Sequence, residues 1–423
     1  MKEIVKFNIK QLGAIKDSSI ELAPLMVFSG ESGLGKSYVA FLVHYIYLLL
    51  TDKDNRLENF FKEQDYNLED LMKNKQTLRI QTSDLLSWIN KDAITYIGYL
   101  LGHTNFTGAV EIDIPIKDAY FEITFDEEIA GLDNNEEVFY QIMLKGYKYS
   151  TPASNYQFEL RPFAQLLKAV LSEVVFGDYL FPKRTFLMPT SRGSLIELNS
   201  MPAFSSGMYE EFFNNQIDLY RPLKEPLKDF PNVLQQCLAK INTGDIQRIE
   251  GSVIYYTNGI ELPITAAASS VKELAPLTLF LKKYSAPGAS ILFEEPEAHL
   301  HPARQIKVAD LIGCILQLGS HIQITTHSDY FIRRLNSLIQ LYRLREKNPE
   351  KYKEISKQRG LKEDCLINPE NINTYVLQKN EDGSTRIIKQ EIGLEGIPFT
   401  SFYDVIEDDI TTSQILKKAL EEE

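Results

Sequence analysis

The stretch Gly30-Glu31-Ser32-Gly33-Leu34-Gly35-Lys36-Ser37 decides the fold of this chain. It matches the pattern of a phosphate-binding loop, in which glycine and four further residues precede Gly-Lys-Ser. The glycines let backbone N–H groups curl around phosphate oxygens, the lysine adds a positive charge, and the serine hydroxyl can bind Mg²⁺. The apolar run 25–28 predicts a buried strand before the loop, and the run 38–50 predicts a buried helix after it. These flanks disfavour the alternative, a glycine-rich turn that ends in Lys-Ser by chance.

The composition is that of an ordinary globular protein. The chain has 423 residues, 44% of them hydrophobic and 24% charged, which is enough for two or three domains. Its net charge of −13 argues against a broad basic surface, so contact with nucleic acid would be local or through a partner. Cys237, Cys314 and Cys365 are far apart in the sequence and form no Cys-x-x-Cys pair, which excludes a disulfide framework and a zinc ribbon. The longest apolar run, 39–50, is shorter than the ~20 residues that a membrane span needs. We therefore expect a cytoplasmic protein.

The motifs divide the chain into three parts. We expect residues 1–50 and 186–423 to form two lobes of one head, with the helical and β region 51–185 inserted between them. Periodicity predicts helices over 85–101 and 163–175, strands over 3–10, 18–28, 109–114, 120–125 and 185–188, and a hairpin over 254–262 that turns at Asn258-Gly259.

A second motif, Ser290–Glu297 (SILFEEPE), is an apolar strand that ends in carboxylates. A strand of this kind, placed beside the strand of the phosphate-binding loop, delivers one acid to the Mg²⁺ shell and a second acid to a water molecule that attacks the γ-phosphate. Glu294 would take the first role and Glu295 the second. The alternative is a strand followed by a solvated acidic turn, since carboxylates are common at strand ends.

A third apolar strand, Gln323–Ser328 (QITTHS), also has a polar end. His327 could donate a hydrogen bond to the γ-phosphate and respond to its loss, or it could be a loop histidine without a role. His299 and His301 could suggest a metal pair, but no third ligand is evident. His301-Pro302 is instead typical of a helix start with proline at the first position.

These motifs together carry a resemblance to a known family. Gly30–Ser37, Ile291–Pro302 (ILFEEPEAHLHP) and Ile324–Asp329 (ITTHSD) resemble the ABC-type ATPase heads of the AAA15/AAA21 class, which are related to the OLD, RecF and SMC/Rad50 proteins. The opening Phe7–Lys16 is similar to the first strand pair of these heads. The resemblance implies an α/β fold, a P-loop NTPase with an ABC-type head whose mixed central sheet is flanked by helices, plus the inserted α+β region. It also implies ATP as substrate, Mg²⁺ as cofactor, and the role of switch histidine for His327.

The family also has a signature segment, which binds the γ-phosphate of the opposite subunit. The candidate here is Ala268–Leu274 (ASSVKEL). Ser270 and Glu273 fit a capping box, which predicts a helix start and an anion site at Ser269 and Ser270. The segment departs from the Ser-Gly-Gly-Gln form of transporter ATPases, which leaves the phosphate contacts open. A helix cap without a ligand is the alternative.

The sequence Pro189-Thr190-Ser191-Arg192 follows a predicted strand and resembles the Pro-Ala-x-Arg element of these ATPases. Arg192 could reach nucleotide phosphates or the other subunit. A structural salt bridge is the alternative.

The resemblance implies an ATPase that dimerises around nucleotide and drives or gates a partner. In this family two heads sandwich two ATP molecules, so we expect a homo-oligomer of at least two chains, no membrane and possible DNA contact. The implied role is DNA repair or anti-phage defence with a separate nuclease or other effector. Three alternatives remain open. They are a non-hydrolysing ATP-dependent scaffold, a transporter ATPase subunit, against which the altered signature argues, and a self-contained nuclease, whose acidic residues we cannot locate.

Overall fold

A computed structural model describes most of the chain. The described residues are 4–51, 56–64, 66–130, 137–153, 159–177, 183–198, 203–220, 231–249, 252–284, 286–359, 363–398 and 400–421.

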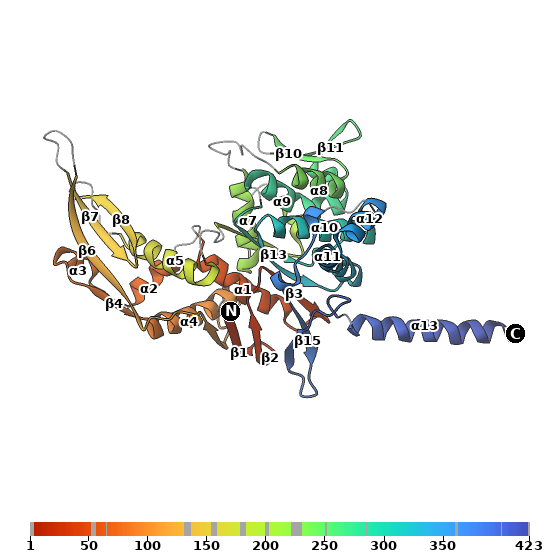
Figure 1. Cartoon of the computed structure of the whole chain (residues 1–423), viewed down its shortest axis with the longest axis horizontal. Coiled ribbons are helices and arrows are strands. Elements are labelled where there is room, and N and C mark those ends of the chain that lie inside the picture. Colours follow the sequence, from red (N-terminus) through yellow and green to blue (C-terminus); the bar gives the residue numbers. More distant parts are fainter. Residues whose placement is uncertain are drawn as a thin grey trace.

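A mixed sheet of nine strands lies at the centre of the described part of the chain (Figure 1). From one edge to the other, the strands are β5 (Gly108–Asp113), β1 (Lys6–Leu12), β2 (Ile15–Glu21), β16 (Thr385–Gln390), β15 (Ile372–Lys379), β3 (Leu25–Gly30), β14 (His321–Thr326), β13 (Ala289–Glu294) and β9 (Arg184–Met188). The five strands from β15 to β9 run parallel, whereas β1 is antiparallel to both of its neighbours. This confirms the predicted α/β class with a mixed central sheet.

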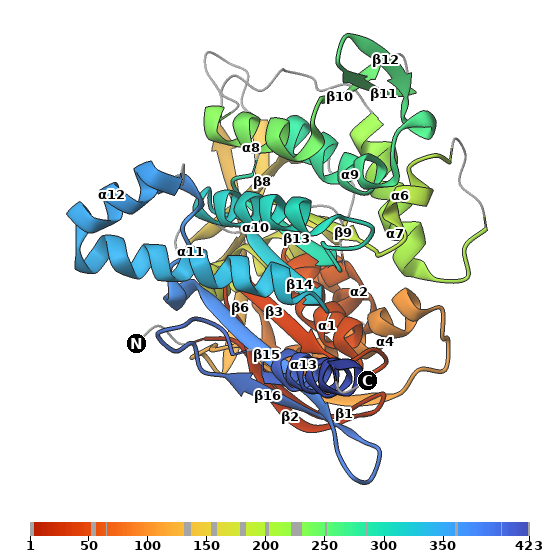
Figure 2. The ribbon, with the colours of Figure 1, turned by 90° about the vertical axis from the view of Figure 1, so that its right-hand side faces the viewer.

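Helices cover both faces of the sheet, because alternate residues of its central strands point into two separate cores. In β3, Phe28 belongs to one core and Val27 to the other. The first core contains α1 (Lys36–Leu49), as the apolar run after the loop predicts. The second contains α8 (Asn232–Asn242), α9 (Ser269–Tyr284), α10 (Pro302–Gln317) and α11 (Asp329–Lys347), which gather on one side in Figure 2. The helices α1 and α9 therefore pack on opposite faces of the sheet.

The chain between α1 and β9 forms an arm at one side of the main sheet (Figure 1). Its elements are α2 (Arg56–Glu63), α3 (Leu68–Lys73), β4 (Leu78–Gln81), α4 (Thr82–Leu101), β6 (Tyr120–Ala130), β7 (Glu137–Leu144), β8 (Tyr147–Pro152) and α5 (Arg161–Phe176), with strands paired in the order β4-β6-β7-β8. The predicted helices over 85–101 and 163–175 and strands over 109–114 and 120–125 are confirmed. One strand leaves the arm, since β5 pairs with β1 and completes the edge of the main sheet.

The remaining elements complete the second lobe and the C-terminal end. They are α6 (Arg192–Leu195), α7 (Gly207–Tyr220), β10 (Asp245–Ile249), β11 (Ser252–Thr257), β12 (Ile260–Pro263), α12 (Pro349–Arg359) and α13 (Thr400–Glu421), with single 3₁₀ turns at 264–266, 363–365 and 369–371. The predicted hairpin is confirmed, because Asn258 and Gly259 both have positive φ, 49° and 76°, between β11 and β12. None of the described helices is both long and apolar enough to cross a bilayer.

One predicted strand needs correction. The predicted strand over 18–28 is two strands, since β2 ends at Glu21 and β3 begins at Leu25. Pro24 lies in the break, where its missing N–H interrupts a strand ladder. The three cysteines, far apart in the sequence, meet in the fold, where none is in a disulfide. The Cys314 thiol hydrogen-bonds with those of Cys237 and Cys365, and these contacts and burial raise the pKa of Cys314.

Candidate nucleotide-binding site

The phosphate-binding loop connects the end of β3 to the start of α1. Gly30, Gly33 and Gly35 have positive φ values of 125°, 81° and 94°, which other residues rarely adopt. A Cβ atom at Gly30 would lie 2.5 Å from the Leu377 carbonyl oxygen, and one at Gly35 would lie 3.0 Å from Cδ1 of Ile15. The helix α1 starts after Gly35 without a side-chain cap and without an acidic residue in its first turn. Its first N–H groups can therefore bind an anion.

Lys36 is buried at the base of the loop. Its Nζ donates to the carbonyl oxygens of Gly30 at 3.0 Å and Glu31 at 2.8 Å. Burial lowers the pKa of Lys36, while the charges of three nearby glutamates oppose this shift. The ammonium group lies inside the loop, where a phosphate could replace the two carbonyl acceptors. In the loop between Gly30 and Lys36, the residues Glu31, Ser32 and Gly33 are exposed and Leu34 is buried.

The carboxylate of Glu294 lies beside Ser37, at the end of β13. Glu294 is 4% exposed, and the Ser37 hydroxyl donates a hydrogen bond to it. Burial raises the pKa of Glu294 to about 7, with a further contribution from the charge of Glu295, although the Ser37 contact and the charges of Arg192 and Lys36 lower it. The sequence-predicted pair Ser37 and Glu294 thus comes together in the fold, although about 260 residues separate them.

Glu295 and His327 face each other at the ends of two neighbouring parallel strands, β13 and β14. His327 Nε2 lies 3.7 Å from Glu295 Oε1, and both side chains are about one third exposed. The backbone of Glu295 has a φ of 42°, and its N–H donates to the Thr325 carbonyl oxygen at 3.0 Å. Burial and the charge of Lys36 lower the pKa of His327. At neutral pH the imidazole is therefore mainly uncharged and offers one N–H donor.

Glu297 is a further residue of this site to which the sequence analysis assigned no role. Its Oε1 accepts hydrogen bonds from the Thr326 hydroxyl at 2.8 Å and from the His327 backbone N–H at 2.6 Å. Burial raises the pKa of Glu297. The carboxylate therefore ties the turn after β13 to the residue at the end of β14. Its sequence signal was a third acid in the same turn, which by itself is also typical of a solvated loop.

The turn after β13 leads directly into α10. His301 caps this helix, since its Nδ1 accepts a hydrogen bond from the Ala303 N–H at 3.2 Å, and Pro302 occupies the first helical position. The prediction of a helix start at His301-Pro302 is confirmed.

The signature candidate forms the start of α9, but the capping box that the sequence predicts is absent. The helix begins at Ser269, two residues earlier than a cap at Ser270 would allow. The Ser270 hydroxyl accepts a hydrogen bond from Arg304, and the Glu273 side chain is buried against Arg192. Ser269 is exposed and Ser270 is half-buried. Both serines lie on α9, which packs on the opposite face of the sheet from α1, the helix that follows the phosphate-binding loop.

Arg192 is the most deeply buried of the predicted site residues, with no exposed surface. Its guanidinium donates to backbone carbonyl oxygens at the end of β9, in α9 and at the end of β13. Its Nε also lies 3.3 Å from the Glu273 carboxylate, an ion pair without hydrogen-bond geometry, because the same N–H donates to the Glu273 carbonyl oxygen. This placement matches the structural alternative rather than contact with phosphate.

The side-chain oxygens of Ser37 and Glu294 suit a hard divalent cation as ligands. Mg²⁺ takes oxygen ligands and is usually held by one or two protein groups together with substrate phosphates and water. The Ser37 hydroxyl and the Glu294 carboxylate are adjacent oxygens, and burial raises the pKa of Glu294. Among the described residues, no group of three or more His, Cys, Asp or Glu side chains could hold an ion alone.

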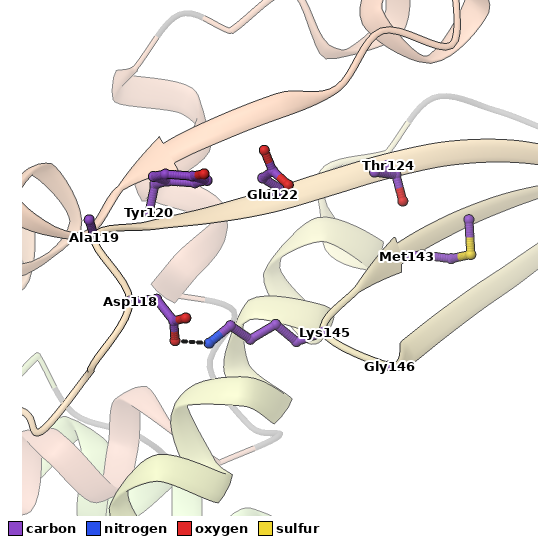
Figure 3. A pocket seen from close by; sticks show the side chains of 8 residues that line it. All are labelled: Asp118, Ala119, Tyr120, Glu122, Thr124, Met143, Lys145 and Gly146. Carbon is purple, nitrogen blue, oxygen red and sulfur yellow. Dashed lines mark hydrogen bonds and ion pairs between the residues drawn. The ribbon is translucent and has the colours of Figure 1, made fainter.

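A cavity of about 580 Å³ lies in the arm, far from these motifs in the sequence (Figure 3). Its charged groups are paired, since Lys145 bonds to Asp118 and Arg79 donates to Glu122 at 2.8 Å. The remaining lining residues include Tyr120, Thr124 and Met143. None of the motif residues lines this cavity.

Comparison with known proteins supports the assignment of the motifs. Residues 197–332 match the AAA ATPase domain family (AAA_15), a segment that holds the signature candidate, β13 and His327. A search of curated proteins found no match to the chain.

Among solved structures, similar ones are heads of SMC proteins. One is an SMC head bound to the C-winged helix domain of ScpA, with 13% identity and a TM-score of 0.38 over 92% of this chain and 97% of that one. Another is the SMC head domain from Thermotoga maritima, with 9% identity and a TM-score of 0.35 over 92% of this chain and 100% of that one. A third is an Smc head domain with an extended coiled coil, bound to the C-terminal domain of ScpA derived from Pyrococcus furiosus, with 11% identity and a TM-score of 0.36 over 96% and 98%.

These TM-scores are too low to carry the assignment, which rests on the family match, the strand order and the placement of the motifs. The phosphate-binding loop, the histidine after β14 and the acidic turn after β13 lie at the carboxyl ends of three parallel strands in the order β3, β14, β13. The expectation that the acidic strand β13 lies directly beside β3 is wrong, because β14 lies between them. Residues 197–332 are thus similar to an AAA ATPase domain, and they lie in an α/β fold with a mixed central sheet.

Proposed function

We propose that this chain binds and hydrolyses ATP in a site that two copies complete together. One observation carries the proposal. Side chains from three separate stretches of sequence meet at the ends of β3, β13 and β14, where a γ-phosphate would lie. They are those of Lys36, Ser37, Glu294, Glu295 and His327. The carboxyl ends of parallel strands are where open α/β sheets bind their ligands.

Each residue has a role that its geometry suits. The Lys36 ammonium moves from the loop carbonyls to the β- and γ-phosphates, and the anion site at the start of α1 binds the same group. Ser37 and Glu294 hold Mg²⁺, which neutralises phosphate charge when bound. Glu295, partly exposed, accepts a proton from the attacking water, and His327 donates a hydrogen bond to the γ-phosphate.

The place of α9 supports the need for a second copy. The signature serines Ser269 and Ser270 start a helix on the opposite face of the sheet from α1, which suits the proposal that they complete the phosphate site of another chain. ATP would then hold two heads together, and its hydrolysis would let them separate.

Mixing two inactive variants tests this arrangement. Lys36→Ala removes the phosphate contact of one chain, and Ser270→Arg blocks the signature of the other. In a mixed dimer, one site carries both lesions and the other carries neither, so the mixture should recover part of the ATPase activity that each variant lacks alone. Full ATPase activity from a chain that stays monomeric with ATP bound would exclude shared sites. Binding of ATP without any turnover would favour the non-hydrolysing scaffold.

We further propose that the head acts on a separate effector protein, such as a nuclease, in DNA repair or anti-phage defence. This part rests on the resemblance of the motifs. The test is a pull-down with the full chain carrying Glu295→Gln, in the presence of ATP, compared with the same variant without nucleotide. A partner that binds only with ATP supports gating by the head. An integral membrane protein as the main partner would support the transporter alternative.

A further inference from the structure

Arg192 joins three parts of the head through backbone carbonyl groups. Its Nε donates to the Glu273 carbonyl oxygen in α9 at 3.0 Å. Its Nη1 donates to the carbonyl oxygens of Pro189, at 3.0 Å, and Glu294, at 2.8 Å, while Nη2 donates to that of Glu295 at 3.2 Å. A guanidinium can donate in several fixed directions at once, which a lysine ammonium cannot do with the same geometry. One side chain thus connects α9 with the end of β13.

A charge in this position is costly. Arg192 has no exposed surface, and burial lowers its pKa to about 10, although the charges of Glu273 and three other glutamates raise it. Apolar side chains of similar volume could fill the same space without the loss of hydration. The chain instead keeps four directed hydrogen bonds, which hold the two elements in one relative position.

The backbone of Glu295 depends on this contact. A φ of 42° is unusual for a residue with a side chain and has to be held by its surroundings. The Glu295 N–H is held by the Thr325 carbonyl oxygen, and its own carbonyl oxygen accepts from Arg192 and from the Ala298 N–H at 3.0 Å. A shift of the guanidinium would therefore turn the Glu295 carboxylate relative to His327.

The other end of the contact lies next to the signature serines. Glu273 follows Ser269 and Ser270 by one helical turn, so movement of the start of α9 is transmitted to the carbonyl group that Arg192 holds. We propose that Arg192 is a positioning residue that couples the signature helix to Glu295, so that closing one composite site on ATP sets the hydrolytic carboxylate of the other. This inference rests on the proposed shared sites and names how the two sites regulate each other.

The first experiment measures ATP binding and turnover of the full chain with Arg192→Lys. This change keeps the positive charge and removes the planar guanidinium that donates in several fixed directions. Coupled sites predict a Hill coefficient above 1 for the parent and about 1 for the variant. We expect kcat per folded molecule to fall at least tenfold, with ATP affinity changed less than threefold, since the phosphate-binding loop is intact. Arg334→Lys is the matched control, because Arg334 donates to Asp310 at 2.6 Å between α10 and α11, away from the motifs. It should leave the Hill coefficient and kcat unchanged.

A Hill coefficient of 1 in a parent that forms ATP-dependent dimers overturns the coupling, and so does a normal kcat in Arg192→Lys. Absence of ATP turnover in the parent would contradict the proposed hydrolysis and not the coupling through Arg192. The cooperativity of ATP binding would then still test the role of Arg192.

The second experiment needs no change at Arg192, so it decides the matter even where the variant does not fold. In the mixed dimer of Lys36→Ala and Ser270→Arg chains, the Lys36→Ala chain supplies only its signature helix to the intact site. With that chain isotope-labelled, hydrogen exchange of its Ala298 N–H, which donates to Glu295, should slow several-fold when ATP binds. Unchanged exchange at Ala298, with ATP bound to the mixed dimer, overturns the proposal.

Discussion

The parallel strand β13 of the head buries charged side chains at its end, whereas the sheet of the arm exposes its charged side chains to water. Every residue of β13 is buried, and the charged groups at its end, Glu294 and Arg192, are buried as well. In the arm, β4 alternates between buried and exposed residues, and Arg79 and Glu122 pair at the surface. A buried charge interacts strongly with its neighbours because little water screens it, whereas a surface pair is screened. The comparison teaches that charges at the ends of the parallel strands act on one another more strongly than the surface pairs of the arm, and the predictions below test this difference.

The largest expected effect is at the end of β13. Glu295→Gln keeps the shape of the side chain and removes the proton acceptor, so kcat should fall by about 10² to 10⁴, the usual contribution of a general base. ATP binding should persist, and the variant should accumulate as closed dimers. The matched change in the arm, Glu122→Gln, should leave turnover as it is. ATPase assays and sizing in ATP measure both, and normal turnover in Glu295→Gln would contradict its assigned role.

Lys36→Ala should come next. The ammonium would make charge-assisted hydrogen bonds to two phosphates, and the loss of both corresponds to about 100-fold or more in affinity, which abolishes ATP binding at working concentrations. The fold should remain intact. Direct ATP titration of the variant checks this, with circular dichroism as the control for folding. An affinity equal to that of the parent would remove the phosphate-binding loop from the site.

The raised pKa of Glu294 predicts a pH-dependent stability in the absence of nucleotide. Its folded pKa of about 7 lies above the usual value of 4.5, so the folded chain binds more protons than the unfolded chain between these two pH values. The stabilising contribution of this group is complete below pH 4.5 and is lost as pH rises through 7.

Urea unfolding at pH 5 and pH 8 of the parent and of Glu294→Gln measures this contribution. The fall in the free energy of unfolding between the two pH values should be larger in the parent by on the order of 2 kcal/mol. Equal pH dependence in the two chains would show that Glu294 titrates normally.

The smallest effect should be in the arm. Lys145 pairs with Asp118 where both side chains are more than one third exposed. Surface pairs contribute about 0–1 kcal/mol, so Lys145→Ala should change the free energy of unfolding by less than about 1 kcal/mol and leave ATP affinity unchanged. Urea unfolding and ATP titration check both. A loss of ATP affinity would contradict the comparison by showing that the arm and the nucleotide site are coupled.

Local sequence determined the elements and the motifs. The apolar run before Gly30, the glycines of the loop and the acids after β13 each mark a strand, a turn or a helix start by residues that are adjacent in the chain. Period-two and helical patterns in the arm predicted β5, β6, α4 and α5 for the same reason. The one break that the sequence analysis missed, at Pro24, was also a local signal.

The tertiary structure alone decided several contacts between distant residues. Arg192 looked like a candidate for phosphate contact in the sequence, and the fold buries it among carbonyl groups of three elements. Glu273 fitted a capping box, yet its carboxylate lies against Arg192, because the ion pair compensates a buried charge that a local cap cannot reach. The contact among the three cysteines and the hydrogen bond from the His327 N–H to Glu297 also depend on tertiary packing. Backbone preference and hydrophobic period act over a few residues, whereas these contacts depend on how sheet and helices pack, which the spacing of residues along the chain does not encode.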